Sequence, residues 1–138
     1  MTRVSPHPDA LLCALVLAPA TFSRNRFYHL YEGAEGRRVR RRARRLRGLI
    51  RQLLGQGRER AELLGRIELS DGAVLLRFRV ENLAYQRSTS LSPLEASLVS
   101  YALSRAGEHE LEAADRERVE ASLARLRDDF PELDLPAP

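Results

Sequence analysis

The segment from Arg37 to Arg51 holds nine arginines in fifteen residues and contains no acidic residue. Apolar residues recur through it at steps of four and three, which is the spacing of one helical face: Val39, Ala43, Leu46, Ile50 and Leu53. Like charges four residues apart cost a helix a few tenths of a kcal/mol each. The pattern therefore predicts an amphipathic helix that is held by its apolar stripe and presents arginine on its other faces.

Positive charge is unevenly distributed along the chain. Residues 1–60 contain 14 arginines against 4 acidic residues, whereas residues 61–138 contain 9 arginines against 15 acidic residues. The chain has no lysine, so every basic side chain except histidine is a planar guanidinium suited to bidentate contacts with phosphate or carboxylate. The first half is expected to face an anionic partner.

Nucleic acid is the partner that we favour for the basic helix. Its exposed side chains are nearly all arginine, with Gln52 as the one amide, which favours phosphate contacts over base reading. We expect weak sequence specificity and a steep salt dependence. The arginines expected to contact phosphate are Arg37, Arg38, Arg40, Arg41, Arg44, Arg45, Arg47 and Arg51, with Arg24 and Arg26 as secondary candidates.

A protein-interaction module is the alternative function. Acidic residues gather between Glu108 and Glu120, and they could meet the arginine helix within one subunit or between subunits of a homo-oligomer. An acidic surface of another protein could also pair with the helix. Anionic lipid is a weaker third partner, because the apolar stripe lacks Trp and Phe.

Catalytic and metal-binding patterns have little support in the sequence. His7, His29 and His109 are scattered, and the Glu108-His109-Glu110 cluster reads as a surface turn rather than a metal site. A single cysteine, Cys13, excludes an internal disulfide and a cysteine-based zinc site. We expect no enzymatic activity, no cofactor and no metal.

The segment before the basic helix is aromatic and apolar. The apolar run at residues 10–20 predicts a buried helix with Asp9 as N-cap and Pro19 as its end. We prefer this interpretation to a signal peptide. We therefore expect a cytoplasmic protein without a membrane span.

A second helix is predicted from Thr21 or Ser23 to Glu32, ended by Gly33. Its aromatic residues could form a nucleic-acid stacking surface. We favour a core position instead, because Phe27, Leu30 and Tyr31 share one helical face.

A short linker, residues 33–36, separates this helix from the basic helix. Gly55-Gln56-Gly57 ends the basic helix, and a short helical turn is expected to follow through Leu64. The order helix, helix, basic helix and hairpin is that of a winged helix-turn-helix, an analogy of order alone.

A β-hairpin is predicted after residue 66. Alternating apolar residues flank Asp71-Gly72, which favours a two-residue type I′ turn. This register pairs Leu69 with Val74 and Ile67 with Leu76, and it places these side chains on one buried face. Leu83, Tyr85 and Arg87 either extend the strand past Asn82 or form a third strand.

Two helices complete the predicted domain. Ser92-Pro93-Leu94-Glu95 carries the signals of a capped helix start, and that helix is expected to run to about Ala106. A last helix is predicted from about Ala113 to Asp129. The fold class is α+β: one domain over residues 1–130 with four to five helices and an antiparallel hairpin, followed by a loose tail at 131–138.

Overall fold

The computed structural model describes residues 5–25, 27–57, 59–81, 86–133 and 135, with backbone alone at 23–25 and 28. The chain has the predicted α+β architecture. Its elements in order are α1 (Pro8–Leu17), the 3-10 segments η1 (Pro19–Asn25) and η2 (Tyr28–Leu30), α2 (Gly33–Leu53), β1 (Ala61–Glu68), β2 (Val74–Val80), β3 (Gln86–Leu91), α3 (Pro93–Arg105) and α4 (Ala113–Asp129).

Helix α1 is buried over residues 10–16, as its apolar sequence predicts. Its N-cap differs from the prediction. The cap residue is His7, whose Nδ1 accepts a hydrogen bond of 3.2 Å from the backbone N–H of Asp9. Pro8 occupies the first helical position, where its missing N–H costs nothing, and the helix begins two residues before the apolar run.

The predicted second α-helix is wrong. The chain forms two short 3-10 segments there, and α2 begins at Gly33 instead of after Gly36. The analogy with a winged helix-turn-helix therefore fails at its first helix pair. The predicted core position is confirmed for Leu30 and Tyr31, which are buried, whereas Phe27 is partly buried and packs against the core. Phe22 is also buried and meets the Tyr31 ring edge-on at 5.9 Å. Edge-on aromatic contacts accompany the 3-10 turns of this segment and pack it on the core.

Helix α2 buries the predicted stripe except for Leu53, which is partly buried. Its buried residues are Gly36, Val39, Ala43, Leu46 and Ile50. Gly36 permits a close approach, since a Cβ built there would lie 2.0 Å from the carbonyl oxygen of Tyr31. The chain before α2 thus packs directly on the helix backbone, which fixes the start of α2 against the core.

The hairpin forms with a register one residue away from the predicted one. Glu68 pairs with Val74, Ile67 with Leu75 and Arg66 with Leu76. The loop has three residues rather than two: the N–H of Leu69 donates to the carbonyl of Ala73 at 2.8 Å, and Gly72 has a φ of 89°. A three-residue loop with a left-handed glycine is the next most common hairpin turn.

This shift turns β1 over. Because side chains alternate between faces, a one-residue change exchanges the buried and exposed sets. Ile67 and Leu69 are 42% and 39% exposed, whereas Arg66 points to the helices. The predicted helical turn through Leu64 is also wrong, because β1 already begins at Ala61. A third strand, β3, does form beside β2 and includes Arg87; Leu83 and Tyr85 lie outside the described residues.

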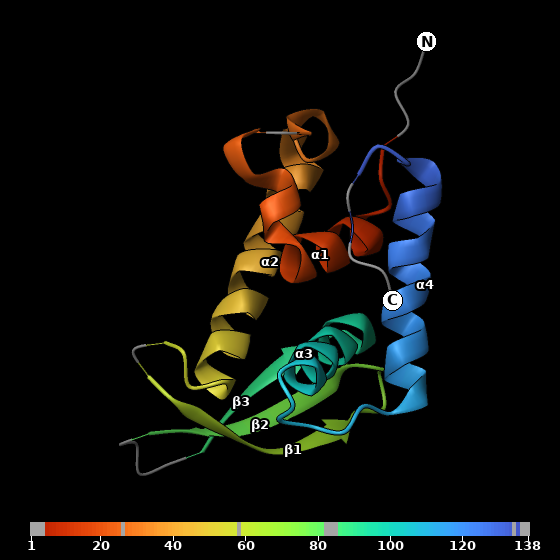
Figure 1. Cartoon of the computed structure of the whole chain (residues 1–138). Helices are drawn as coiled ribbons and strands as arrows, with labels where there is room; N and C mark the ends of the chain where they lie inside the picture. The colour runs from red at the N-terminus through yellow and green to blue at the C-terminus, as the bar shows by residue number, and fades with distance from the viewer. Residues whose placement is uncertain (1–4, 26, 58, 82–85, 134, 136–138) are drawn as a thin grey trace.

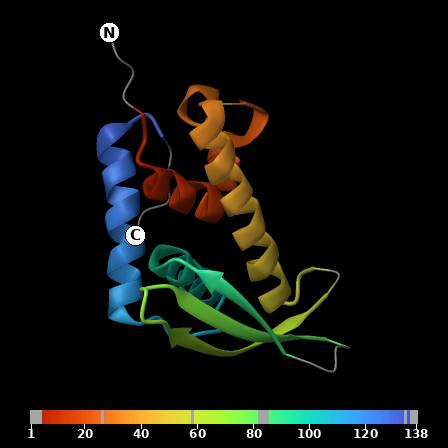
Figure 2. The same ribbon diagram turned by 180° about the vertical axis from the view of Figure 1, so that it is seen from behind.

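The sheet has the order β1-β2-β3 and lies below the helices in Figure 1. Helix α3 packs on β2 and β3 and is buried on nearly all sides. Its start carries the predicted capping box, in which Ser92 and Glu95 exchange hydrogen bonds of 3.0 and 3.2 Å. The opposite face of the sheet carries no helix in either Figure 1 or Figure 2.

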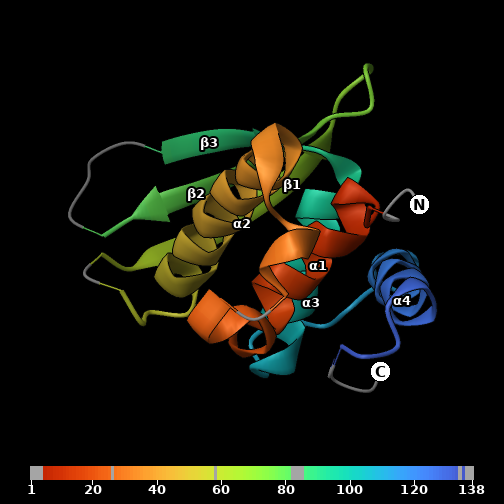
Figure 3. The ribbon, with the colours of Figure 1, turned by 90° about the horizontal axis from the view of Figure 1, so that it is seen from above.

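Helices α2 and α4 lie on opposite sides of the α1–α3 pair (Figures 1 and 3). The predicted loose tail contains two leucines, Leu133 and Leu135, that are buried in the core. No helix in the described part of the chain has both the length and the apolarity to cross a bilayer.

Candidate functional site

The arginine face of α2 is the set of arginines predicted on this helix. Seven of the eight are solvent-exposed and one, Arg47, is partly buried. The exposed ones are Arg37, Arg38, Arg40, Arg41, Arg44, Arg45 and Arg51. Positions 37, 41, 44 and 51 recur at multiples of about 3.6 residues, so they follow one line opposite the buried stripe, over about 21 Å of helix axis.

The charge of this face is partly balanced at the flank that faces α1 and the start of α3. Glu95, at the start of α3, is 6% exposed, and its Oε2 lies 3.5 Å from a guanidinium nitrogen of Arg45 and 3.6 Å from Nε of Arg42. Arg42 also lies 4.0 Å from Asp9. These separations are too long for good hydrogen bonds, and Glu95 Oε2 has no hydrogen-bond partner among the described residues.

Among the described residues, the acidic cluster between Glu108 and Glu120 does not neutralise the arginine face within the subunit. The ion pairs of α2 run to Asp9 and Glu95, and among the described residues none runs to the acids of 108–120. Helix α4 lies across the molecule from α2 (Figure 1). The outward arginines of α2 therefore keep their charge exposed to solvent.

The other flank of α2 meets the aromatic segment. The guanidinium carbon of Arg40 lies 5.1 Å from the centre of the Tyr31 ring, a cation–π distance. This contact holds the Arg40 side chain along the helix. Arg26 lies outside the described residues, and of Arg24 only the backbone, in η1, is described.

A groove adjoins the arginine face on the side of the sheet. It has a volume of about 680 Å³ and lies between the C-terminal half of α2 and strands β2 and β3. Arg44, Arg45 and Arg51 line it together with apolar residues of the sheet, including Phe78 and Leu91. Sequence reasoning missed this groove, because its two walls are 25 or more residues apart in the chain.

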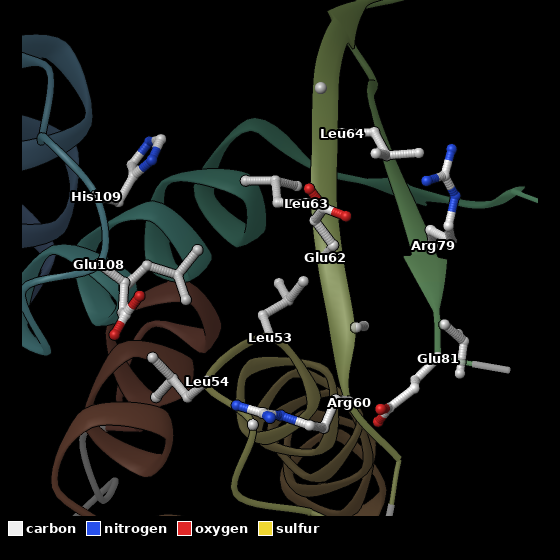
Figure 4. Close-up of a pocket in the computed structure, with 15 residues that line it drawn as sticks. Leu53, Leu54, Arg60, Glu62, Leu63, Leu64, Arg79, Glu81, Glu108 and His109 are labelled. Atoms are coloured by element: carbon white, nitrogen blue, oxygen red, sulfur yellow. The ribbon is translucent and has the colours of Figure 1, made fainter.

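A second cleft, of about 790 Å³, lies beside the edge strand β1 (Figure 4). Leu53, Leu54 and Leu63 point into it from α2 and β1, and His109 borders it from the loop between α3 and α4. Charges of both signs surround it, Arg60 among them. Its mixed charge does not select an anion.

A buried ionic cluster joins β1 to α4, and no local sequence pattern predicted it. Asp115 is 3% exposed and accepts two hydrogen bonds from Arg66, of 2.9 and 3.2 Å. Ser97 donates to the same carboxylate at 2.7 Å, and Arg118 donates to Ser97 at 2.7 Å. Burial raises the pKa of Asp115, but the hydrogen bonds from Arg66 and Ser97 outweigh it, so the pKa is lowered. This cluster is an internal tie rather than an exposed site.

The described residues contain neither an activated cysteine nor a group of metal ligands. Burial raises the pKa of the Cys13 thiol to about 12, so the thiolate is not available near neutral pH. Within the part of the chain that the structure describes, no three His, Cys, Asp or Glu side chains converge as metal ligands.

Comparisons with known proteins give no relative from which a function could be transferred. No protein-family model, no curated protein and no solved structure matches the chain. The arginine face and the groove beside it are therefore interpreted on their own chemistry.

Proposed function

We propose that the chain binds nucleic acid through the arginine face of α2, by phosphate contacts with little dependence on base sequence. The supporting observation is an exposed line of arginines, Arg37, Arg41, Arg44 and Arg51, on a helix whose opposite face is locked into the core. Such a helix holds several guanidinium groups at fixed spacing, and each can form bidentate bonds to a phosphate.

The arginine face lies on an ordered helix, and this favours nucleic-acid binding over a flexible basic segment that is only solvated. A flexible basic tail would lose conformational entropy on binding, whereas α2 is already folded. The acids at its flank, Asp9 and Glu95, contact Arg42 and Arg45 and leave the outward line without an ionic partner in the described structure. Phosphate can therefore approach that line without displacing an internal ion pair.

The test is a fluorescence-anisotropy titration of labelled nucleic acid, duplex and single-stranded, at low salt. We expect the triple variant Arg37→Gln, Arg41→Gln, Arg44→Gln to bind roughly 10–100-fold more weakly than the parent chain. The matched control neutralises three exposed arginines away from α2: Arg105, Arg116 and Arg125.

The control removes the same net charge from other elements, so it should change the affinity by less than about threefold, since screening limits distant charges. Equal weakening by both triple variants would mean that net charge alone drives binding. Absence of binding to either form of nucleic acid at low salt would refute the proposed function.

The second candidate, an interaction or assembly module, is favoured by the edge of the sheet. Ile67, near the end of β1, and Leu69, just after it, are exposed on an edge strand beside the second cleft. Light scattering tests the self-assembly form of this function. It predicts a dimer that the double variant Ile67→Asp, Leu69→Asp converts to monomer; a monomeric parent chain at high concentration argues against it.

A further inference from the structure

The groove beside the arginine face combines two chemistries that phosphate binding alone does not need. Its floor is apolar, with Leu49 half-buried and Phe78 and Leu91 buried. Its rim carries Arg44 and Arg51, both exposed. The volume of about 680 Å³ lies in the usual range of small-ligand sites. A ligand that fills it would present an apolar surface and an anionic group side by side.

A nucleotide of a single strand has this combination. Its base offers two apolar faces, and its phosphate lies one sugar away. In a duplex the base faces are covered by stacking, and only the base edges can be reached in the grooves. The apolar floor can therefore contact a base only when that base is unstacked.

The groove also offers polar groups that could meet a base edge. Gln52 and the half-buried Thr89 line the groove and offer hydrogen-bonding groups. The Gln52 amide donates to Glu59 at 3.3 Å, which orients the Gln52 side chain. Glu59 is the single acid among the lining residues, and its carboxylate repels phosphate from that side.

We infer that this groove seats an unstacked base of a single-stranded nucleic acid whose phosphates contact Arg44, Arg45 and Arg51. The inference rests on the proposed function and adds its substrate class. Charge alone works against it, because duplex DNA has the higher charge density and releases more counterions per contact. A preference for single strands over duplex is thus a direct signature of the groove.

The experiment uses the full chain and three labelled probes of equal length at low salt. The probes are oligothymidylate, an abasic oligomer with the same number of phosphates, and a duplex. We expect oligothymidylate to bind roughly tenfold more tightly than the abasic oligomer, because seating the base buries apolar surface. We also expect it to bind more tightly than the duplex.

Two neutral variants locate the effect in the groove. Leu49→Gln makes the floor polar and should abolish the difference between oligothymidylate and the abasic oligomer while the affinity for the abasic oligomer stays constant. Leu111→Gln, at a half-buried leucine in the loop between α3 and α4 and outside the groove, is the matched control and should keep the difference. Thermal unfolding followed by circular dichroism checks that both variants fold.

Each contrary outcome has its own meaning. Equal binding of oligothymidylate and the abasic oligomer to the parent chain overturns the groove inference and leaves phosphate binding by α2 intact. Failure of all three probes to bind at low salt removes the proposed function and this inference together. If bases have no effect, but an acidic amphipathic peptide binds the parent chain and not Leu49→Gln, the groove is a protein-docking site and the inference is wrong.

Discussion

Arg66 is a partly buried arginine in a strand whose neighbouring residues are largely apolar. It belongs to a strand end that alternates with apolar residues, yet its guanidinium reaches Asp115 and lies 3.5 Å from the hydroxyl of Ser100. Asp115, in turn, is held by Ser97 and lies 3.7 Å from Arg118. Two partly exposed cations and one buried carboxylate thus tie β1, α3 and α4 together.

Replacing Asp115 should destabilise the fold. In Asp115→Asn the amide cannot accept both Arg66 hydrogen bonds and carries no charge to offset the two arginines. We expect a loss of about 2–3 kcal/mol in the free energy of unfolding, less than for a fully buried pair, because Arg66 and Arg118 are 26% and 41% exposed. Urea denaturation measures it. Asp128→Asn, on the exposed side of α4, is the control and should change stability by less than about 0.5 kcal/mol.

The same carboxylate predicts a pH dependence. The pKa of Asp115 is lower in the folded chain than in the unfolded chain. As the pH falls, the unfolded chain therefore binds the proton first, and this destabilises the fold. The contribution is complete above about pH 4 and is lost as the pH falls through the folded-state pKa. The stability gap between the parent chain and Asp115→Asn should therefore narrow below about pH 4 in urea titrations. A gap that stays constant down to pH 2 would contradict the assignment.

At the scale of elements, α2 was predictable and the segment before it was not. The stripe at Val39, Leu46 and Ile50 has a helical period of its own, and the structure confirms it. Residues 21–32 also carry a helical pattern, but the chain forms 3-10 turns there, with Phe22 and Tyr31 packed in the core. Local spacing decides an element when its periodic face is long, and packing decides it when the segment is short.

Two glycines of α2 should respond oppositely to alanine. Gly48 is exposed and a Cβ there meets nothing within 4 Å, so Gly48→Ala should stabilise the chain by about 0.5–1 kcal/mol through helix propensity. A Cβ at Gly36 would overlap the Tyr31 carbonyl at 2.0 Å, so Gly36→Ala should destabilise it by more than about 2 kcal/mol. Thermal denaturation separates the two; equal shifts would contradict the packing of Tyr31 on α2.

The register of the hairpin could not be decided from the sequence. Asp71-Gly72 suits a two-residue loop and also a three-residue loop with a left-handed glycine, and the two differ by one residue in register. Apolar alternation favours the first. The structure has the second, with Arg66 inside, paired to Asp115 at a sequence separation of 49. A contact that distant leaves no trace in the local pattern.

This register can be checked by mutation. Ile67 is 42% exposed, so Ile67→Ala should cost less than about 1 kcal/mol. Leu76, its partner in the predicted register, is 2% exposed, and Leu76→Ala should cost about 2–5 kcal/mol. Chemical denaturation of both variants gives the comparison. Similar large losses at both positions would support the two-residue loop instead.

At the scale of the whole molecule, the fold separates its charged surfaces. Helix α2 occupies one side and α4 the other, with α1 and α3 between them (Figure 1). The sequence predicted which arginines gather on α2, because they share one element. It could not predict the groove between Leu49 and Leu91 or the partnership of Arg45 with Glu95, since these depend on how distant elements pack.

The most direct test of the central claim, that α2 binds phosphate, is the slope of log affinity against log salt concentration. Each phosphate contact contributes about 0.7–0.9 to this slope, so four to six contacts predict a value between roughly −3 and −5. The Arg37→Gln, Arg41→Gln, Arg44→Gln variant should flatten it by about two to three units, since each lost contact removes about one. An affinity independent of salt, or a slope that this variant leaves unchanged, would contradict the claim.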